Sequence, residues 1–107
     1  MSSQSKLRVM ADYGSSGIWS DGDTGPFRHG MVEHNDLNLP CELAAAFETW
    51  IDRYWGQKDW NQPEKELFNQ QGRELAERLK AFVGVETLVV FQGEQWPAGI
   101  GPEELVP

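Results

Sequence analysis

The sequence has a single cysteine, few basic residues and no long apolar run, and each absence excludes a class of protein. Cys41 is the one cysteine in 107 residues, so an internal disulfide framework is excluded. No apolar run approaches the roughly 18 residues of a membrane-spanning helix. The opening residues, Met-Ser-Ser-Gln-Ser-Lys, also lack the apolar stretch of a signal peptide. These absences predict a cytoplasmic protein.

Basic residues are strongly outnumbered by acidic ones. Lys and Arg total 9 against 17 Asp and Glu, which gives a formal net charge of -8 and a pI near 4.6. Such a charge repels phosphate backbones and anionic lipids, because binding to them depends on basic contacts. We therefore expect no nucleic acid and no membrane as partner. A basic protein, in contrast, would be attracted at long range.

The first half of the chain predicts one strand and possible short extensions of a sheet. Residues 7–13 alternate apolar and polar side chains, which indicates a half-buried strand with Tyr13 facing the core and Asp12 facing away. Ile18 and Trp19 can add a short extended piece, and residues 30–33 another.

Two amphipathic helices and a further strand are predicted in the second half. Apolar residues recur every three or four positions from Pro40 to about Trp55, and again from the expected N-cap Asn61 to about Phe82. Gly72 falls on the apolar face of the second helix, where a glycine is costly, so we expect a close approach of a neighbouring element. Residues 85–92 are typical of a strand buried on both faces.

These elements predict an α+β fold. Two amphipathic helices and an isolated strand pair cannot bury their apolar faces separately. We therefore expect a two-layer sandwich, with the two helices packed on one face of a small β-sheet and strands 7–13 and 85–92 adjacent. The length predicts a single domain over residues 1–107, with a flexible N-terminus at 1–5 and an extended, loosely ordered tail at 93–107.

The long segment from Tyr13 to Asp36 has the right residue types for a metal site but the wrong spacing. Asp21 and Asp23 resemble the start of a calcium loop, yet Gly25 and Val32 occupy later ligand positions. Transition-metal donors are also concentrated here, without the spacing of a zinc motif, at His29, Glu33, His34, Asp36 and Cys41. We expect ordinary polar loop residues, a Cys41 partly buried by helix packing, and no cofactor.

Two serines in the same segment raise the question of a nucleophile or an anion-binding turn. Ser15 and Ser16 lie between Gly14 and Gly17, without a Gly-x-Ser-x-Gly elbow or a Walker motif. A plain turn is the favoured interpretation.

Tryptophans and carboxylates supply candidates for a protein interface. Trp50 lies on the helix stripe and is expected in the core, whereas Trp96 lies outside the regular elements. Exposed tryptophans anchor many protein interfaces, and nearby carboxylates suit a basic partner. The binding candidates are Asp12, Trp19, Asp21, Asp23, Asp36, Trp55 and Trp60.

Three stretches of the chain carry a resemblance to a known group of proteins. They are the segment Asp12-Tyr-Gly-Ser-Ser-Gly-Ile-Trp19, the segment Leu37-Asn-Leu-Pro-Cys-Glu-Leu43 with Phe47, Trp50 and Tyr54 after it, and the segment from Phe68 to Lys80. The pattern resembles small acidic bacterial proteins of unknown function, some of which are similar to immunity proteins of polymorphic or contact-dependent toxin systems. The resemblance implies an α+β fold and toxin neutralisation, and it implies no catalytic residues.

Our leading hypothesis is a non-enzymatic protein-binding domain, an immunity protein that presents an acidic and aromatic surface to a basic toxin. One alternative is a small hydrolase or metal-dependent enzyme that uses His29, His34 and the loop carboxylates. A third is a homodimeric structural domain.

Overall fold

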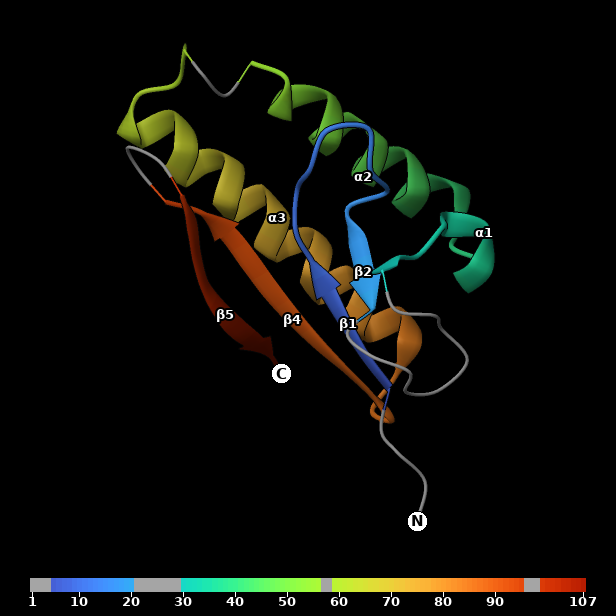
Figure 1. The fold of residues 1–107 in the computed structure, drawn as a ribbon. Helices are drawn as coiled ribbons and strands as arrows, with labels where there is room; N and C mark the ends of the chain where they lie inside the picture. The colour runs from blue at the N-terminus through green and yellow to red at the C-terminus, as the bar shows by residue number, and fades with distance from the viewer. Residues whose placement is uncertain (1–4, 21–29, 57–58, 96–98) are drawn as a thin grey trace.

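The computed structural model describes residues 5–20, 30–56, 59–95 and 99–107, which form two layers. One layer is a mixed sheet of strand order β3-β2-β1-β4-β5, and α2 and α3 cover one of its faces (Figure 1). The predicted α+β sandwich is therefore confirmed. In chain order the elements are β1 (Ser5–Val9), β2 (Ile18–Ser20), β3 (Gly30–Met31), α1 (His34–Leu37), α2 (Cys41–Tyr54), α3 (Gln62–Val83), β4 (Thr87–Glu94) and β5 (Ile100–Val106).

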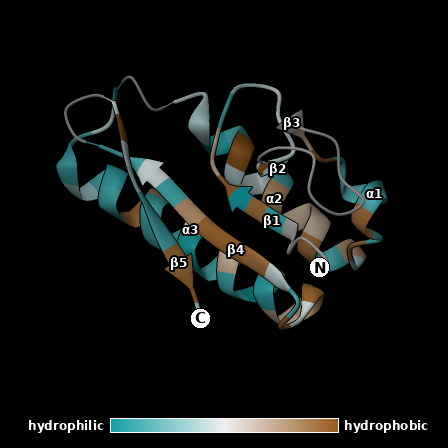
Figure 2. Cartoon of the chain, turned by 60° about the horizontal axis from the view of Figure 1, so that its bottom comes forward, coloured by the Kyte–Doolittle hydropathy of each residue, from teal (hydrophilic) through white to brown (hydrophobic). Residues whose placement is uncertain are grey.

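The two central strands of the sheet, β1 and β4, come from segments that are far apart in the sequence. β1 pairs in parallel with β4, from Ser5 opposite Thr87 to Val9 opposite Phe91, and pairs antiparallel with β2 on its other side. This confirms the predicted adjacency of the opening strand and the strand at 85–92. Consecutive burial of Val89, Val90 and Phe91 gives β4 the apolar middle that is visible in Figure 2.

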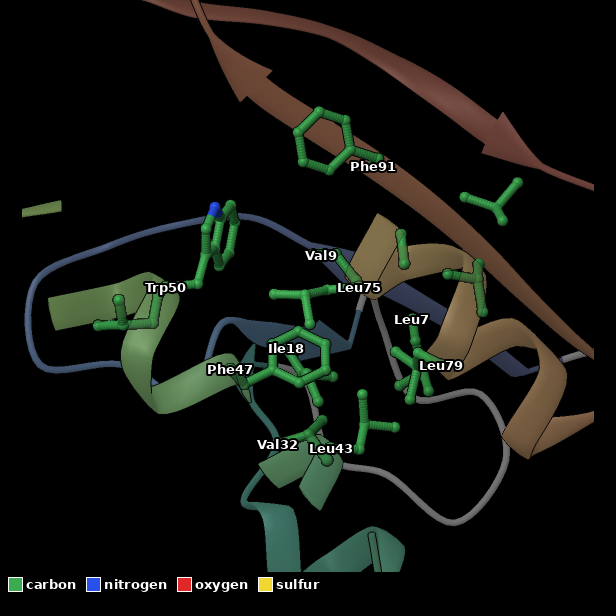
Figure 3. Packing of buried hydrophobic residues seen from close by; sticks show 14 of the residues in the cluster. Leu7, Val9, Ile18, Val32, Leu43, Phe47, Trp50, Leu75, Leu79 and Phe91 are labelled. Atoms are coloured by element: carbon green, nitrogen blue, oxygen red, sulfur yellow. The ribbon is translucent and has the colours of Figure 1, made fainter. Parts of the chain in front are cut away.

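The core lies between the sheet and the two long helices. Figure 3 shows side chains from α2, α3, β1, β2 and β4 converging there, including Leu7, Ile18, Phe47, Trp50, Leu75, Leu79 and Phe91. Trp50 is in the core as predicted, where its ring stacks on Phe68 at 4.7 Å between centroids and its Nε1 donates to the Phe68 carbonyl at 3.0 Å. A Cβ added at Gly72 would lie 2.6 Å from Trp50 Cζ2 and would also overlap the Phe91 ring. The expected close approach at Gly72 is confirmed.

The sequence also predicts correctly where α3 begins and ends. Asn61 Oδ1 accepts a hydrogen bond from Glu64 N at 2.9 Å, and Glu64 Oε1 accepts one from Asn61 N at 3.4 Å. This reciprocal capping box satisfies amide groups that the first turn leaves without partners. Gly84 ends the helix with φ 86°, a conformation that glycine adopts without strain. Phe82, however, is exposed rather than part of the buried stripe.

Two predictions about the ends of elements are wrong. The opening strand stops at Val9, so Tyr13 lies in a turn and is 40 % exposed. In place of a loose tail, β5 pairs antiparallel with β4, and Val106 is buried against Val89. Arg73 on α3 also holds β5 through two hydrogen bonds, from Nε and Nη2, to the two carboxylate oxygens of Glu104 at 3.0 and 2.9 Å.

Other predictions about the chain have mixed outcomes. Residues 1–4 of the predicted flexible N-terminus lie outside the described residues, and so does Trp96. The one-turn helix α1 was not predicted. Among the described residues, the helices all fall short of the length and apolarity that crossing a membrane requires.

Candidate functional site

Three aromatic rings meet at the end of α2 and form an exposed cluster. Tyr54 is the last residue of α2, Trp55 is its C-cap, and Tyr13 reaches them from the β1–β2 connection. The Tyr13 ring lies 4.7 Å from both the Tyr54 and the Trp55 rings, measured between centroids, at interplanar angles of 49° and 53°. Trp55 is 62 % exposed. A large aromatic surface is therefore presented to solvent at this end of the molecule.

The β1–β2 connection holds Tyr13 through a tight turn. Asp12 Oδ1 accepts a hydrogen bond from Tyr13 N at 2.8 Å, and the Asp12 carbonyl accepts from Ser15 Oγ at 2.9 Å. Gly14 and Gly17 adopt φ values of 68° and 82°, which strain most other residues. This turn fixes the backbone of Asp12 and Tyr13 and so places the Tyr13 ring against Tyr54 and Trp55.

Carboxylates flank the aromatic cluster. Asp12 is exposed beside Tyr13, and Glu94, at the end of β4, forms a hydrogen bond with the Tyr54 hydroxyl. Burial first, and then this hydrogen bond and the negative charge of Glu94, raise the pKa of Tyr54 above its usual range. We call Asp12, Tyr13, Tyr54, Trp55 and Glu94 the acidic-aromatic end.

A family model of Serratia CdiI immunity protein-like proteins matches residues 5–94. The chain belongs to this family. The match spans β1 to β4 and includes every residue of the acidic-aromatic end, whereas β5 follows it in the chain. The resemblance to immunity proteins of contact-dependent toxin systems is therefore confirmed. A search of the curated proteins found no match.

In this CdiI-like protein, two of the predicted binding residues lie at the acidic-aromatic end and a third lies behind it. Asp12 and Trp55 belong to the surface itself. Trp60 is half-buried and packs on Phe68 at 4.8 Å, while Phe68 in turn stacks on Tyr54 at 5.9 Å, both measured between ring centroids. Trp60 therefore supports the surface from below.

The remaining predicted binding residues do not join this surface within the described part of the chain. Trp19 is half-buried, and its Nε1 donates to the Met10 carbonyl at 2.9 Å. Asp36 caps α1 by accepting from Glu33 N at 3.1 Å. It precedes α2, whereas Trp55 follows α2, and these 14 residues span about 21 Å. Asp21 and Asp23 lie outside the described residues.

The histidine alternative concerns residues of which the structure describes only a part. His34 is half-buried, its Nε2 is hydrogen-bonded to the Ser16 carbonyl at 2.9 Å, and its ring lies 5.8 Å from that of Phe47. His29 lies outside the described residues. Across the described ranges, no three side chains of His, Cys, Asp or Glu are grouped to hold a metal ion. Cys41 is exposed, contrary to the expectation of partial burial.

The two serines of the turn serve the backbone. Ser16 is buried, its Oγ donates to the Val32 carbonyl at 2.6 Å, and it also accepts from Ile18 N at 3.3 Å. Ser15 Oγ donates to the Asp12 carbonyl, as described above. Both hydroxyls thus hold the connection between the strands, in agreement with the plain-turn interpretation.

Sequence reasoning missed three residues of the acidic-aromatic end. The alternation of residues 7–13 predicts Tyr13 in the core, the helical repeat from Pro40 to about Trp55 places Tyr54 on the apolar face, and Glu94 falls in the predicted tail. One signal was available: Tyr54 and Trp55 are adjacent at a helix end, and side chains one position apart project about 100° from each other. A buried stripe about 100° wide can hold two adjacent residues, as it does at Trp50 and Ile51, so this spacing marks Trp55 only as a residue at the edge of the stripe.

Proposed function

We propose that this protein is an immunity protein that neutralises a toxin by binding it. The observation that carries the proposal is membership of the Serratia CdiI immunity protein-like family over residues 5–94. Neutralisation by masking requires a complementary surface and a few well-placed anchors rather than a reactive group. The cytoplasmic location expected from the sequence is part of this proposal.

We place the contact surface at the acidic-aromatic end. Trp55 and Tyr13 are the kind of exposed aromatic residues that anchor interfaces, and the turn at Asp12 orders them in advance, which lowers the entropic cost of binding. The carboxylates Asp12 and Glu94, together with the net charge of -8, favour a basic toxin surface.

The test is a binding titration with a candidate toxin domain, chosen from the products of genes that neighbour this protein's gene. Trp55→Ala should weaken binding by at least about tenfold, since it removes an aromatic anchor. Asp12→Asn should mainly slow association and reduce the dependence of the rate on salt. Isothermal titration calorimetry measures the first effect, and stopped-flow or biosensor kinetics at several salt concentrations measure the second.

Two positions for matched controls, Val85 and Glu86, lie in the turn between α3 and β4. This turn is at the end of α3 that is far from the acidic-aromatic end. Val85→Ala shortens an exposed apolar side chain, and Glu86→Gln removes one negative charge, as Asp12→Asn does. Both controls should bind as the parent protein does. If Trp55→Ala and Val85→Ala bind equally well, the contact surface lies elsewhere. If the parent protein fails to bind the toxin domain, the immunity function itself is refuted.

A further inference from the structure

A groove runs along the outer side of the helical layer, between α2 and α3. Two hollows of about 290 and 230 Å³ adjoin there, and both are lined by Arg53 and Gln71. The buried side chains of Trp50, Phe68 and Leu75 contribute to the lining. The groove thus combines apolar side chains with a polar rim, and none of the five residues of the acidic-aromatic end lines its hollows.

One stripe of α3 follows the groove along its length. Glu64, Leu67, Gln71, Glu74 and Arg78 line the hollows, at successive spacings of three, four, three and four residues. Such spacing keeps side chains on one face of a helix and is the seam pattern of paired helices. From Glu64 to Arg78 the stripe covers about 21 Å.

The stripe is self-complementary about its middle. Glu64 lies seven residues before Gln71 and Arg78 seven after it, while Leu67 and Leu75 lie four before and four after. If two copies of α3 run antiparallel with a two-fold axis at Gln71, Glu64 of each copy faces Arg78 of the other. The exposed Leu67 of each copy then faces the hollow that the buried Leu75 of the other copy lines. A two-fold interface requires this reciprocity.

Three of these side chains, Glu64, Leu67 and Arg78, are exposed and accessible to a partner, whereas Leu75 is buried and lines the hollow from below. Leu67 is 56 % exposed although it borders a hollow. In the described part of the chain, the structure gives Arg78 neither a hydrogen bond nor an ion pair. Glu64 uses Oε1 in the capping box and has Oε2 as a second acceptor. Arg78 and Glu64 therefore do not pair with each other within one copy. In a dimer, Arg78 of each copy would form an ion pair with Glu64 of the other copy.

We propose that the α2–α3 groove is the interface of a homodimer, with the two α3 helices antiparallel about Gln71. Each copy fills the groove of the other with Leu67, and two Glu64–Arg78 pairs flank this contact. The stripe is short compared with the roughly 800 Å² per partner of a standard interface. The dimer is therefore weak and concentration-dependent. This proposal does not depend on toxin binding.

Sedimentation equilibrium of the full chain, from about 1 µM to about 1 mM, tests the proposal. About 0.15 M salt limits the repulsion between two acidic copies to a range of about 8 Å. Arg78→Glu and Glu64→Lys should each weaken the dimer by about tenfold or more, because each places like charges opposite one another. The double variant exchanges the charges within both pairs and should restore the dimer to within about threefold of the parent.

Two further variants separate the proposed contact from a general effect of charge and from the loss of the helix cap. Glu77→Lys makes the same charge change at an exposed α3 position that does not line the hollows, and it should leave the dimer unchanged. Because Glu64→Lys also removes a helix cap, Leu67→Ala provides a test that keeps the cap intact and should weaken the dimer as well. A parent protein that stays monomeric at every concentration overturns the proposal. A double variant that dimerises more weakly than either single variant also overturns it.

Discussion

At the scale of single residues, Gly72 is constrained from two directions. The indole of Trp50 and the ring of Phe91 occupy the space that a side chain would need, and both are buried in the core. In an exposed helix, glycine costs about 1 kcal/mol relative to alanine. Here the helix accepts that cost because it allows α2 and β4 to approach α3 closely.

We predict that Gly72→Ala destabilises the protein by about 1–3 kcal/mol despite its better helix propensity, since overpacking outweighs the propensity gain. The free energy of unfolding in urea measures the effect. Gln70→Ala, at an exposed position of the same helix, should change stability by less than about 0.5 kcal/mol. A Gly72→Ala variant that is more stable than the parent would show that the neighbouring rings move aside easily.

The candidate surface was only partly predictable from single residues. Asp12 and Trp55 were recognised because a tryptophan off the helix stripe and a carboxylate near a turn are visible in the sequence. The adjacency of the two central strands was predicted, but the sequence pattern ends the second strand at residue 92, whereas β4 continues to Glu94 and carries it to this surface. Asp36 was predicted to lie on the same surface as Asp12, because both are in or beside the long segment from Tyr13 to Asp36. In the structure, α1 instead holds Asp36 at the opposite end of α2 from Trp55.

At the scale of elements, α3 depends on its first turn. The capping box between Asn61 and Glu64 satisfies two amide groups, and Pro63 occupies an early position where its missing amide hydrogen costs nothing. The helix carries both the groove and, through Phe68, the support for Tyr54. The start of α3 therefore matters for both proposed surfaces.

Asn61→Ala should lower the free energy of unfolding by about 1 kcal/mol, the usual cost of losing an N-cap. Chemical denaturation followed by circular dichroism measures this change. The neighbouring Gln62→Ala keeps the capping box and should have a much smaller effect. If the two variants prove equally stable, the box contributes nothing to α3.

The helices were predictable from the sequence and β5 was not. In α2 and α3 a local repeat of apolar residues marks the buried face over several turns. β5 contains Gly101 and Pro102 and has only Val106 buried, so the polar segment resembles a tail. Its strand conformation follows from pairing with β4 and from Arg73, contacts that no local pattern reveals.

At the scale of the whole molecule, charge opposes compactness. The chain has a net charge of -8, and two salt bridges between described residues, Lys6–Glu103 and Arg73–Glu104, lie at partly exposed positions, where such pairs contribute little. Repulsion among the carboxylates should therefore dominate the response to salt.

We expect the unfolding temperature to rise by about 4 °C between about 0.02 and about 0.5 M sodium chloride, a shift that corresponds to roughly 1 kcal/mol. Differential scanning calorimetry gives this value directly. Glu86→Gln removes one exposed charge and should make the salt effect smaller. An unfolding temperature that falls with salt would mean that attractive pairs outweigh the repulsion.

The position of β1 in the middle of the sheet has a consequence for synthesis in the cell. Its parallel partner β4 begins at Thr87, so the central pair joins segments that leave the ribosome far apart in time. Pairing between such distant segments slows folding and delays it until the later one has emerged. Each newly made molecule can therefore complete its central sheet only after the segment from Thr87 to Glu94 has emerged. If the protein neutralises a toxin as proposed, a cell must hold folded copies of it before the toxin enters.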